Sequence, residues 1–213
     1  MERGRFITFE GGEGAGKSTQ IRHLADWLSA RGIEALVTRE PGGSPGAEAI
    51  RHLLVTGEKH RWDPLTETLL HFAARADHVA RTIEPALAAG RWVVCDRFVD
   101  STVAYQGYGQ NVDRTFIANL AHAILGDIRP DLTLLLDIPV DIGLARAAKR
   151  RGDENRYETM DLGFHERIRV GFRDMAIADP GRFIVIDANA DPDTVQKRIE
   201  AAVEAHLFPA KRR

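Results

Sequence analysis

The chain has 213 residues and a formal net charge of −2, and its 44% hydrophobic and 28% charged residues are typical of a soluble globular protein. The charge balance gives no broad basic field, so we expect no nucleic-acid partner. The single cysteine, Cys95, excludes an intrachain disulfide and favours a reducing, cytoplasmic location. No apolar run of about eighteen residues occurs, so a membrane span or membrane partner is not expected either.

From the N-terminus, short apolar runs alternate with longer amphipathic stretches, a pattern typical of βαβ units on a parallel sheet. The first strand is predicted over residues 5–10, and a helix follows over 17–30. A second strand covers 33–38. The glycine- and proline-rich segment 41–46 is a loop by composition, and a short helix follows it to about Leu54.

The middle of the chain is predicted to be mainly helical. Residues 64–89 form one long helix, which Pro85 should bend near Ile83. A third strand covers 92–95, and helical segments occupy much of 101–125.

The last part of the chain returns to alternating strands and helices. A fourth strand is predicted over 132–137, and a helix follows over 140–150. The remaining elements are a helix over about 157–178, a strand over 183–186 and a helix from about Asp193. Five parallel strands wrapped by helices on both faces predict a doubly wound α/β fold, whose ligands bind beyond the carboxyl ends of the strands.

The segment Gly11–Ser18 matches the pattern G-x-x-x-x-G-K-[ST], with a predicted strand before it and a predicted helix after it. Such a loop binds phosphates, because its glycines let backbone N–H groups turn inward and the helix N-terminus adds positive charge. We expect Lys17 to reach the β- and γ-phosphates of a nucleoside triphosphate and the Ser18 hydroxyl to bind Mg²⁺. The fold is therefore predicted to be of the P-loop NTPase type.

A phosphate-binding loop does not identify the reaction, and three classes of protein compete. These are a GTPase switch, a motor or transport ATPase, and a small-molecule kinase. The N-K-x-D motif that reads guanine is absent from the sequence, and the chain is too short to carry an appended machine. A kinase needs a second phosphate site, so the remaining motifs must decide between these three classes.

Asp96 and Arg97 close the third predicted strand, so both side chains are expected at the ligand edge of the sheet. A carboxylate there can hold Mg²⁺-bound water, and an arginine can bridge two phosphates with its planar fork. The alternative is a surface ion pair. Asp137 ends the fourth predicted strand and is a rival acid, but Pro139 follows it closely and no arginine accompanies it, so we prefer Asp96.

A basic segment lies between two predicted helices and contains Lys149, Arg150, Arg151 and Arg156. Such a segment can close over transferring phosphates and exclude water, and its arginines would stabilise the charge on the phosphoryl oxygens. A solvated charged turn explains the same composition. We expect one domain over residues 1–213, with a lid at about 147–158.

Five segments resemble the bacterial thymidylate kinases, a family of P-loop nucleoside monophosphate kinases. They cover nearly the whole chain in the right order and are residues 6–20, 38–43, 96–107, 130–137 and 151–158. The most specific is the block Asp-Arg-Phe-Val-Asp-Ser-Thr-Val-Ala-Tyr-Gln-Gly at 96–107, because other nucleoside monophosphate kinases lack it.

The resemblance implies that the γ-phosphate of ATP passes to dTMP with the help of Mg²⁺, giving ADP and dTDP on the route to dTTP. The implied catalytic residues are Glu13, Lys17, Asp96, Arg97 and Arg151, and the implied metal ligands are Ser18 and Asp96. Those implied at ATP are Gly11, Gly12, Glu13, Gly14, Ala15, Gly16, Lys17, Ser18, Thr19 and Arg146, the last of which would stack on adenine. In this family the lid supplies an arginine when the phosphate-binding loop lacks one, as here; which lid arginine acts stays open.

On the acceptor side, the resemblance implies contacts to each part of dTMP. Glu13 would lie near the deoxyribose 3′-OH, where Tyr105 would leave no room for a 2′-OH. Arginines would hold the phosphate and the thymine, a Thr/Gln pair would read the base edge, and Glu158 matches a lid position. The implied dTMP-binding residues are Glu13, Arg51, His71, Phe72, Arg75, Arg97, Thr102, Tyr105, Gln106 and Tyr157.

One position departs from the family pattern. The family usually has a phenylalanine four residues before the thymine-binding arginine, whereas here His71 stands four before Arg75 and Phe72 stands three before it. Residues three and four positions apart lie on the same face of a helix, so either ring could stack on thymine. Stacking by His71 would allow a pH dependence of dTMP binding near neutrality.

The family forms homodimers, and residues 64–89 and the segment after Tyr108 are candidates for the interface, although the sequence does not identify the face. Two other functions stay open from the residues alone. One is a kinase for UMP, CMP or GMP, which the Thr102, Tyr105 and Gln106 block disfavours. The other is a nucleotide-binding switch or sensor that has no acceptor.

Overall fold

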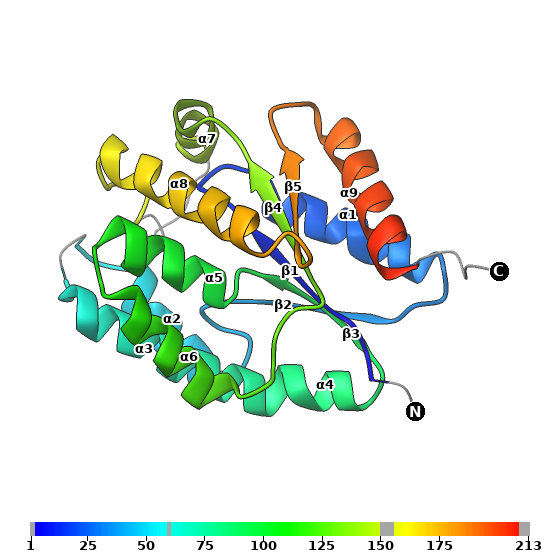
Figure 1. The fold of residues 1–213 in the computed structure, drawn as a ribbon, viewed down its shortest axis with the longest axis horizontal. Helices are drawn as coiled ribbons and strands as arrows, with labels where there is room; N and C mark the ends of the chain where they lie inside the picture. The colour runs from blue at the N-terminus through cyan, green and yellow to red at the C-terminus, as the bar shows by residue number, and fades with distance from the viewer. Residues whose placement is uncertain (1–2, 59–60, 150–155, 209–213) are drawn as a thin grey trace.

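A computed structural model of the chain describes residues 3–58, 61–149 and 156–208. Five parallel strands form one sheet in the order β2-β3-β1-β4-β5 (Figure 1). The strands are β1 (Phe6–Glu10), β2 (Ala35–Arg39), β3 (Trp92–Asp96), β4 (Leu132–Asp137) and β5 (Phe183–Asp187). The predicted doubly wound parallel sheet is confirmed, with β2 beginning at Ala35 rather than Ile33.

Helices cover both faces of the sheet (Figure 1). The α-helices are α1 (Lys17–Ser29), α2 (Pro45–Val55), α3 (Pro64–His78), α4 (Glu84–Ala88), α5 (Val99–Thr102), α6 (Arg114–Leu125), α7 (Val140–Ala147), α8 (Leu162–Ala178) and α9 (Pro192–Leu207). Two segments are π-helical: η1 (Val79–Ile83) connects α3 to α4 without a break, and η2 (Val103–Gly109) continues α5. Within the three described ranges, no helix has the length and apolar character needed to cross a membrane.

The long helix predicted over 64–89 consists of three consecutive pieces, α3, η1 and α4. The Asp63 side chain caps the start of α3 by accepting backbone N–H groups of the first turn. Pro85 has no backbone N–H to donate to the hydrogen bonds of the helix, and the wider π-turn of η1 lies just before it. The predicted irregularity near Ile83 is therefore a π-turn.

The helix predicted from about Tyr157 begins later, at Leu162. Asp161 caps it, because its Oδ1 accepts the Phe164 N–H at 2.8 Å. Residues 156–159 form a turn before the cap. This turn keeps Tyr157 off the helix and leaves its ring free to reach the cavity described below.

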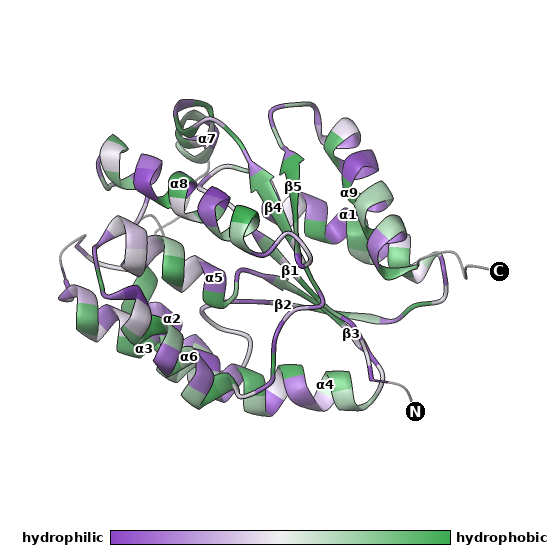
Figure 2. Ribbon diagram, viewed as in Figure 1, coloured by the Kyte–Doolittle hydropathy of each residue, from purple (hydrophilic) through white to green (hydrophobic). Residues whose placement is uncertain are grey.

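Strand β1 is buried along its whole length between β3 and β4. Ile7 and Phe9 pack on one face with residues of α1 and α9, whereas Phe6 packs on the other face with residues of β3, η1 and α4. Thr8 is also fully buried and forms a 2.8 Å hydrogen bond with Thr133 of β4. Burial on both faces explains why the strands are predominantly hydrophobic (Figure 2).

The sheet brings two sequence motifs to one edge. Phe9 of β1 is in register with Asp96 of β3, so the two strands end side by side. The phosphate-binding loop follows β1, and Arg97 follows β3. The predicted ligand edge is therefore a consequence of neighbouring parallel strands.

Candidate active site

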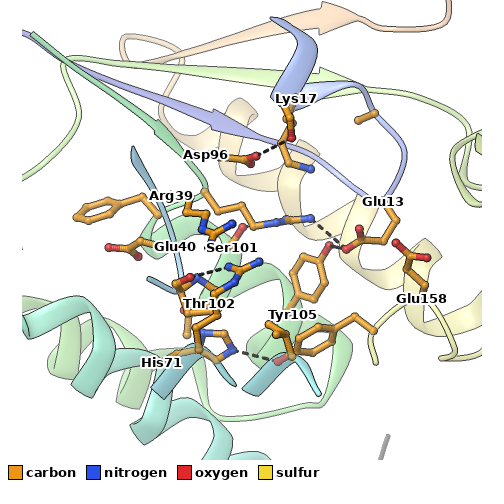
Figure 3. Close-up of a pocket in the computed structure, with 18 of the residues that line it drawn as sticks. Glu13, Lys17, Arg39, Glu40, His71, Asp96, Ser101, Thr102, Tyr105 and Glu158 are labelled. Carbon is orange, nitrogen blue, oxygen red and sulfur yellow. Dashed lines mark hydrogen bonds and ion pairs between the residues drawn. The ribbon is translucent and has the colours of Figure 1, made fainter. Parts of the chain in front are cut away.

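A cavity of about 710 Å³ opens at the carboxyl edge of the sheet, a volume within the usual range for small-molecule sites. Its wall combines the phosphate-binding loop and the start of α1, the loop after β2 with α2 and α3, and residues 96–106 (Figure 3). The predicted site residues that it brings together are Glu13, Gly14, Ala15, Gly16, Lys17, Ser18, Thr19, Arg51, His71, Arg75, Asp96, Arg97, Thr102, Tyr105, Gln106, Arg146 and Tyr157.

Some predicted residues are placed elsewhere. Gly11 and Gly12 line a small neighbouring cavity behind the loop and do not line the large one. Phe72 is buried in the protein interior, 1% exposed, and is absent from the cavity wall. Arg151, with half of the predicted lid, lies outside the described residues.

The phosphate-binding loop has a conformation that only glycine readily adopts at Gly14, where φ is 67° and a Cβ would lie 1.9 Å from the Gly143 carbonyl oxygen. The Lys17 ammonium lies over the loop and donates to the carbonyl oxygens of Gly11 and Gly12, each at 3.1 Å. Burial, followed by the charge of Arg97, lowers the pKa of Lys17 to about 8. A nearby anion would reverse that shift, so this position suits a phosphate group.

Asp96 lies beside the start of α1. The Ser18 hydroxyl donates to its Oδ2 at 3.2 Å (Figure 3), and its buried Oδ1 has no hydrogen-bond partner within residues 3–58, 61–149 and 156–208. The rival acid, Asp137, instead accepts two hydrogen bonds from Arg169, at 2.8 and 3.1 Å, and lines the small cavity. The two acids therefore have different surroundings, and only Asp96 faces the Ser18 hydroxyl.

Arg97, Glu13 and Tyr105 line the cavity and form a connected group, of which Figure 3 labels Glu13 and Tyr105. Arg97 donates from Nη2 to Glu13 Oε1 at 3.0 Å, and the Tyr105 hydroxyl donates to the same oxygen at 2.6 Å. The Arg97 backbone has a φ of 71°, in the left-handed region that non-glycine residues rarely adopt. Such strain concentrates at functional sites, where it fixes a side chain in place.

Glu10 supports this group and was not predicted. It is fully buried at the end of β1 and accepts the Phe98 N–H at 2.8 Å and the Ser101 hydroxyl at 2.6 Å. Ser101 in turn accepts a hydrogen bond from Arg97 at 3.1 Å. Burial, followed by the charge of Asp100, raises the pKa of Glu10 to about 8. An acid closing an apolar strand was the sequence feature that could have revealed it.

Arg75 crosses the floor of the cavity on α3. Its Nε donates to Glu40 at 2.7 Å, and its Nη2 donates to the Phe98 carbonyl oxygen and the Thr102 hydroxyl at 3.2 and 3.1 Å. Its Nη1 is buried and has no partner in the described part of the chain. Glu40, which was not predicted, therefore fixes a guanidinium that keeps one N–H group for a ligand.

His71 lies on the cavity wall at the Tyr157 hydroxyl, 3.0 Å from its Nε2 (Figure 3). Burial, followed by the charges of Arg75 and Arg156, lowers the pKa of His71 to about 3. The imidazole is therefore neutral near neutrality, and the titration that the sequence allowed there is wrong. A ring held among arginines in this way is uncharged throughout the physiological range.

A buried acid lies behind the wall at the end nearest the lid. Glu67 is fully buried and accepts hydrogen bonds from Gln106 at 2.8 Å and from Tyr157 at 3.0 Å, and it forms an ion pair with Arg156. The sequence singled out Gln106, Tyr157 and Arg156 but not Glu67. Its partners are distant along the chain, so no local pattern could have shown the cluster.

The remaining cationic residues of the wall have backbone contacts. Arg51 donates to the Pro41 carbonyl oxygen at 2.6 Å, and Arg146 donates to that of Ala188 at 3.2 Å. Arg39 also lines the cavity and forms an ion pair with Glu48 at 3.1 Å, although the sequence interpretation gave it no role. Positive charge is thus distributed around the wall, as anionic ligands require.

Comparisons with known proteins agree with one another. A family model described as thymidylate kinase matches residues 9–199. The thymidylate kinase of Afipia carboxidovorans is 57% identical over 210 residues, which cover 98% of this chain and 92% of the relative. That of Caulobacter vibrioides is 55% identical over 207 residues, which cover 97% and 99%. The solved thymidylate kinase of Ehrlichia chaffeensis is 35% identical, with a TM-score of 0.79 over 94% of this chain and 99% of its own.

Proposed function

The chain belongs to the thymidylate kinase family, and from this premise we propose how its residues carry out the ATP-dependent phosphorylation of dTMP. The reaction moves the γ-phosphoryl group of ATP to dTMP and yields ADP and dTDP. One observation carries the assignment of residues: a single cavity joins the phosphate-binding loop to a second wall around Arg75 and Gln106. A protein that only binds or hydrolyses a triphosphate does not need that second wall.

The donor half of the site is the loop from Gly11 to Thr19, together with Arg146 for the adenine. Lys17 exchanges its two carbonyl contacts for the β- and γ-phosphates of ATP, whose charge favours the protonated amine. Backbone N–H groups of the loop and the start of α1 bind the remaining phosphate oxygens. In the small cavity behind this loop, Gly11 and Gly12 act through their backbone.

The acceptor half holds the phosphate and sugar of dTMP. Arg97 and Arg51 bind the dTMP phosphate, and Glu13, held by Arg97 and Tyr105, lies near the 3′-OH. The Tyr105 ring packs against the sugar. Phosphoryl transfer of this kind needs positioning and charge stabilisation but no protein nucleophile, and arginines on the acceptor side supply both.

The lid over residues 147–158 closes this arrangement. Tyr157 and Glu158 lie on the cavity wall and cover the acceptor half, and Arg151 supplies the arginine that the phosphate-binding loop lacks. The whole chain, 1–213, acts as one domain with this lid.

The residues at the loop fit a bound Mg²⁺ ion. The Oδ1 of Asp96, which has no hydrogen-bond partner among the described residues, and the adjacent Ser18 hydroxyl are hard oxygen donors, which Mg²⁺ prefers in combination with phosphate oxygens and water. Ser18 and Asp96 would hold the ion, the latter through its bound water. When bound, Mg²⁺ neutralises the charge of the phosphates.

Thymine lies against Arg75, Thr102 and Gln106. Within the described residues, the Nη1 group of Arg75 is a donor without a hydrogen-bond partner, and the buried Oε1 of Gln106 is an acceptor without one. His71 stacks on the base, since Phe72 lies in the protein interior. A neutral imidazole suits that role because it brings no charge to the base.

The functional enzyme is a homodimer. Leu65 and Leu69 on α3 and Phe116 on α6 are exposed apolar side chains, and the two helices pack beside each other. A second copy of the chain would bury this face.

The division of roles is tested by Lys17→Ala and Arg97→Ala. Each should lower kcat by about 10²–10³-fold, as expected for loss of one charge-stabilising group. The matched control is Arg169→Ala, which removes an arginine from the rival acid Asp137 outside the large cavity. Full activity in either test variant would remove that residue from the mechanism.

A further inference from the structure

We propose that Glu67 sets the preference for thymine over cytosine by fixing the orientation of the Gln106 side-chain amide. Glu67 lies on α3 behind the cavity wall, so it is a positioning residue that does not touch dTMP. The inference rests on the proposed placement of the base against Arg75 and Gln106.

Several donors converge on the Glu67 carboxylate. Its Oε1 accepts from Gln106 Nε2 at 2.8 Å, from Gln110 Nε2 at 2.9 Å and from the Tyr157 hydroxyl at 3.0 Å. Its Oε2 accepts from Arg156. The side chain is fully buried, and an ionised carboxylate can only accept hydrogen bonds. Every neighbour must therefore present an N–H or O–H group to it.

This requirement determines which way the Gln106 amide points. Its NH₂ group faces Glu67, so its carbonyl oxygen must face away. That oxygen, Oε1, is buried and finds no hydrogen-bond partner in the described ranges of the chain. Glu40 fixes Arg75 in a comparable way and leaves its Nη1 donor without a partner there. Both residues line the cavity, and we infer that these two buried atoms, the acceptor of Gln106 and the donor of Arg75, are the groups that meet the base.

An acceptor beside a donor matches thymine and opposes cytosine. Thymine has a donor at N3 and an acceptor at O4, whereas cytosine has an acceptor at N3 and an amino donor at C4. Uracil shares the thymine pattern. A Gln106 amide turned the other way would present NH₂ to the base and favour N3 of cytosine. A site built for one pattern leaves polar groups unpaired with the other, which gives strong discrimination.

The test is a cycle of variants assayed by kcat/KM for dTMP, dUMP and dCMP. In Glu67→Gln, residue 67 can donate or accept, so the Gln106 amide can adopt both orientations. We expect the dTMP/dCMP ratio to fall by at least about tenfold, while the dTMP/dUMP ratio stays within about twofold. A general distortion of the pocket would change both ratios.

A second set of variants reverses the hydrogen bond between residues 67 and 106 and should restore kcat/KM for dTMP. Gln106→Glu alone sets two carboxylates against each other and should lower kcat/KM for dTMP. In the double variant Glu67→Gln/Gln106→Glu, residue 67 donates and the other carboxylate oxygen of residue 106 still offers an acceptor to the base. We expect kcat/KM for dTMP to recover by at least about tenfold relative to Gln106→Glu, with the dTMP/dCMP ratio restored. This comparison holds even if Glu67→Gln does not fold.

Gln110→Met is the matched control, because it removes another hydrogen bond to Glu67 from a residue outside the cavity wall. Its dTMP/dCMP ratio should equal that of the parent. An unchanged ratio in folded Glu67→Gln, or no recovery in the double variant, would overturn the role of Glu67. An unchanged ratio in Gln106→Leu would instead overturn the placement of the base, and the inference with it, while leaving the phosphorylation of dTMP intact.

Discussion

At the residue scale, buried carboxylates determine where the cavity's functional groups point. Glu40 accepts a hydrogen bond from Arg75, and Glu10 accepts one from Ser101, which in turn contacts Arg97. Glu67 forms an ion pair with Arg156 at the end of the cavity nearest the lid. Glu40 and Glu67 form buried ion pairs, and loss of one partner from such a pair leaves an uncompensated charge and typically costs about 3–5 kcal/mol. These acids therefore matter to the site, although Glu10 and Glu67 do not line the cavity.

His71 gives a prediction on pH. Its pKa in the folded chain, about 3, lies below the ordinary value of 6.5, so the unfolded chain binds more protons between these values. Its contribution to stability is complete above pH 6.5 and is lost as the pH falls toward 3. We expect the parent Tm to fall more steeply than that of His71→Phe between pH 6.5 and pH 4 in thermal melts, as the shift from 6.5 to about 3 requires.

His71 should also leave the binding of dTMP insensitive to pH near neutrality. Since the imidazole is already neutral, the dTMP KM of the parent should show no His71 titration between about pH 6 and pH 8. His52→Phe, at an exposed site on α2, is the control for the new aromatic ring. A Tm of His71→Phe with the same pH dependence as the parent would contradict the shifted pKa.

Residues carried by local motifs could be predicted from the sequence, and those defined by distant partners could not. The phosphate-binding loop and the Asp96-Arg97 pair follow single strands, so their place at the sheet edge follows from the strand pattern. Glu67 and Arg156 are far apart along the chain, and their contact appears only when α3 and the turn over residues 156–159 come together. The choice between His71 and Phe72 likewise depends on how α3 is rotated against the core.

At the element scale, the sequence located the strands closely and the helix ends less well. Apolar runs of the right length define buried strands, whereas the start of α8 depends on the Asp161 cap and the preceding turn. The π-turns of η1 and η2 leave no distinct hydrophobic period, so the sequence predicted a bent helix at η1 and helical segments at η2 without distinguishing the π-turns.

The helices α3 and α6 give a prediction on assembly. Leu65 and Leu69 are four residues apart on one helix face and are 49% and 46% exposed, and Phe116 on α6 is 37% exposed. We expect Leu69→Glu to convert a dimer to a monomer in size-exclusion chromatography with light scattering, because a charge would be buried at the interface.

The control for this change is Ile177→Glu on α8, which places the same charge at a side chain that is 78% exposed. It should remain dimeric. A parent that runs as a monomer at micromolar concentration, or a dimeric Leu69→Glu, would contradict an interface on α3 and α6.

At the scale of the whole molecule, the parallel sheet explains why donor and acceptor residues meet. Strands β1 and β3 are neighbours in the sheet although α1 through α4 separate them in the chain. Their carboxyl ends place the phosphate-binding loop beside Arg97, and the loop after β2 and helix α3 complete the cavity. The fold class was predictable because strand and helix patterns alternate clearly.

The most direct test of the account is the acceptor dependence of ADP release. Purified enzyme with ATP and Mg²⁺ is assayed with dTMP, dUMP, dCMP, UMP, GMP or AMP, and with no acceptor. The two-sided cavity predicts rapid ADP release with dTMP, much slower release with dCMP, UMP, GMP or AMP, and almost none without an acceptor. Equal ADP release with and without dTMP, or a higher kcat/KM for another nucleotide, would contradict it.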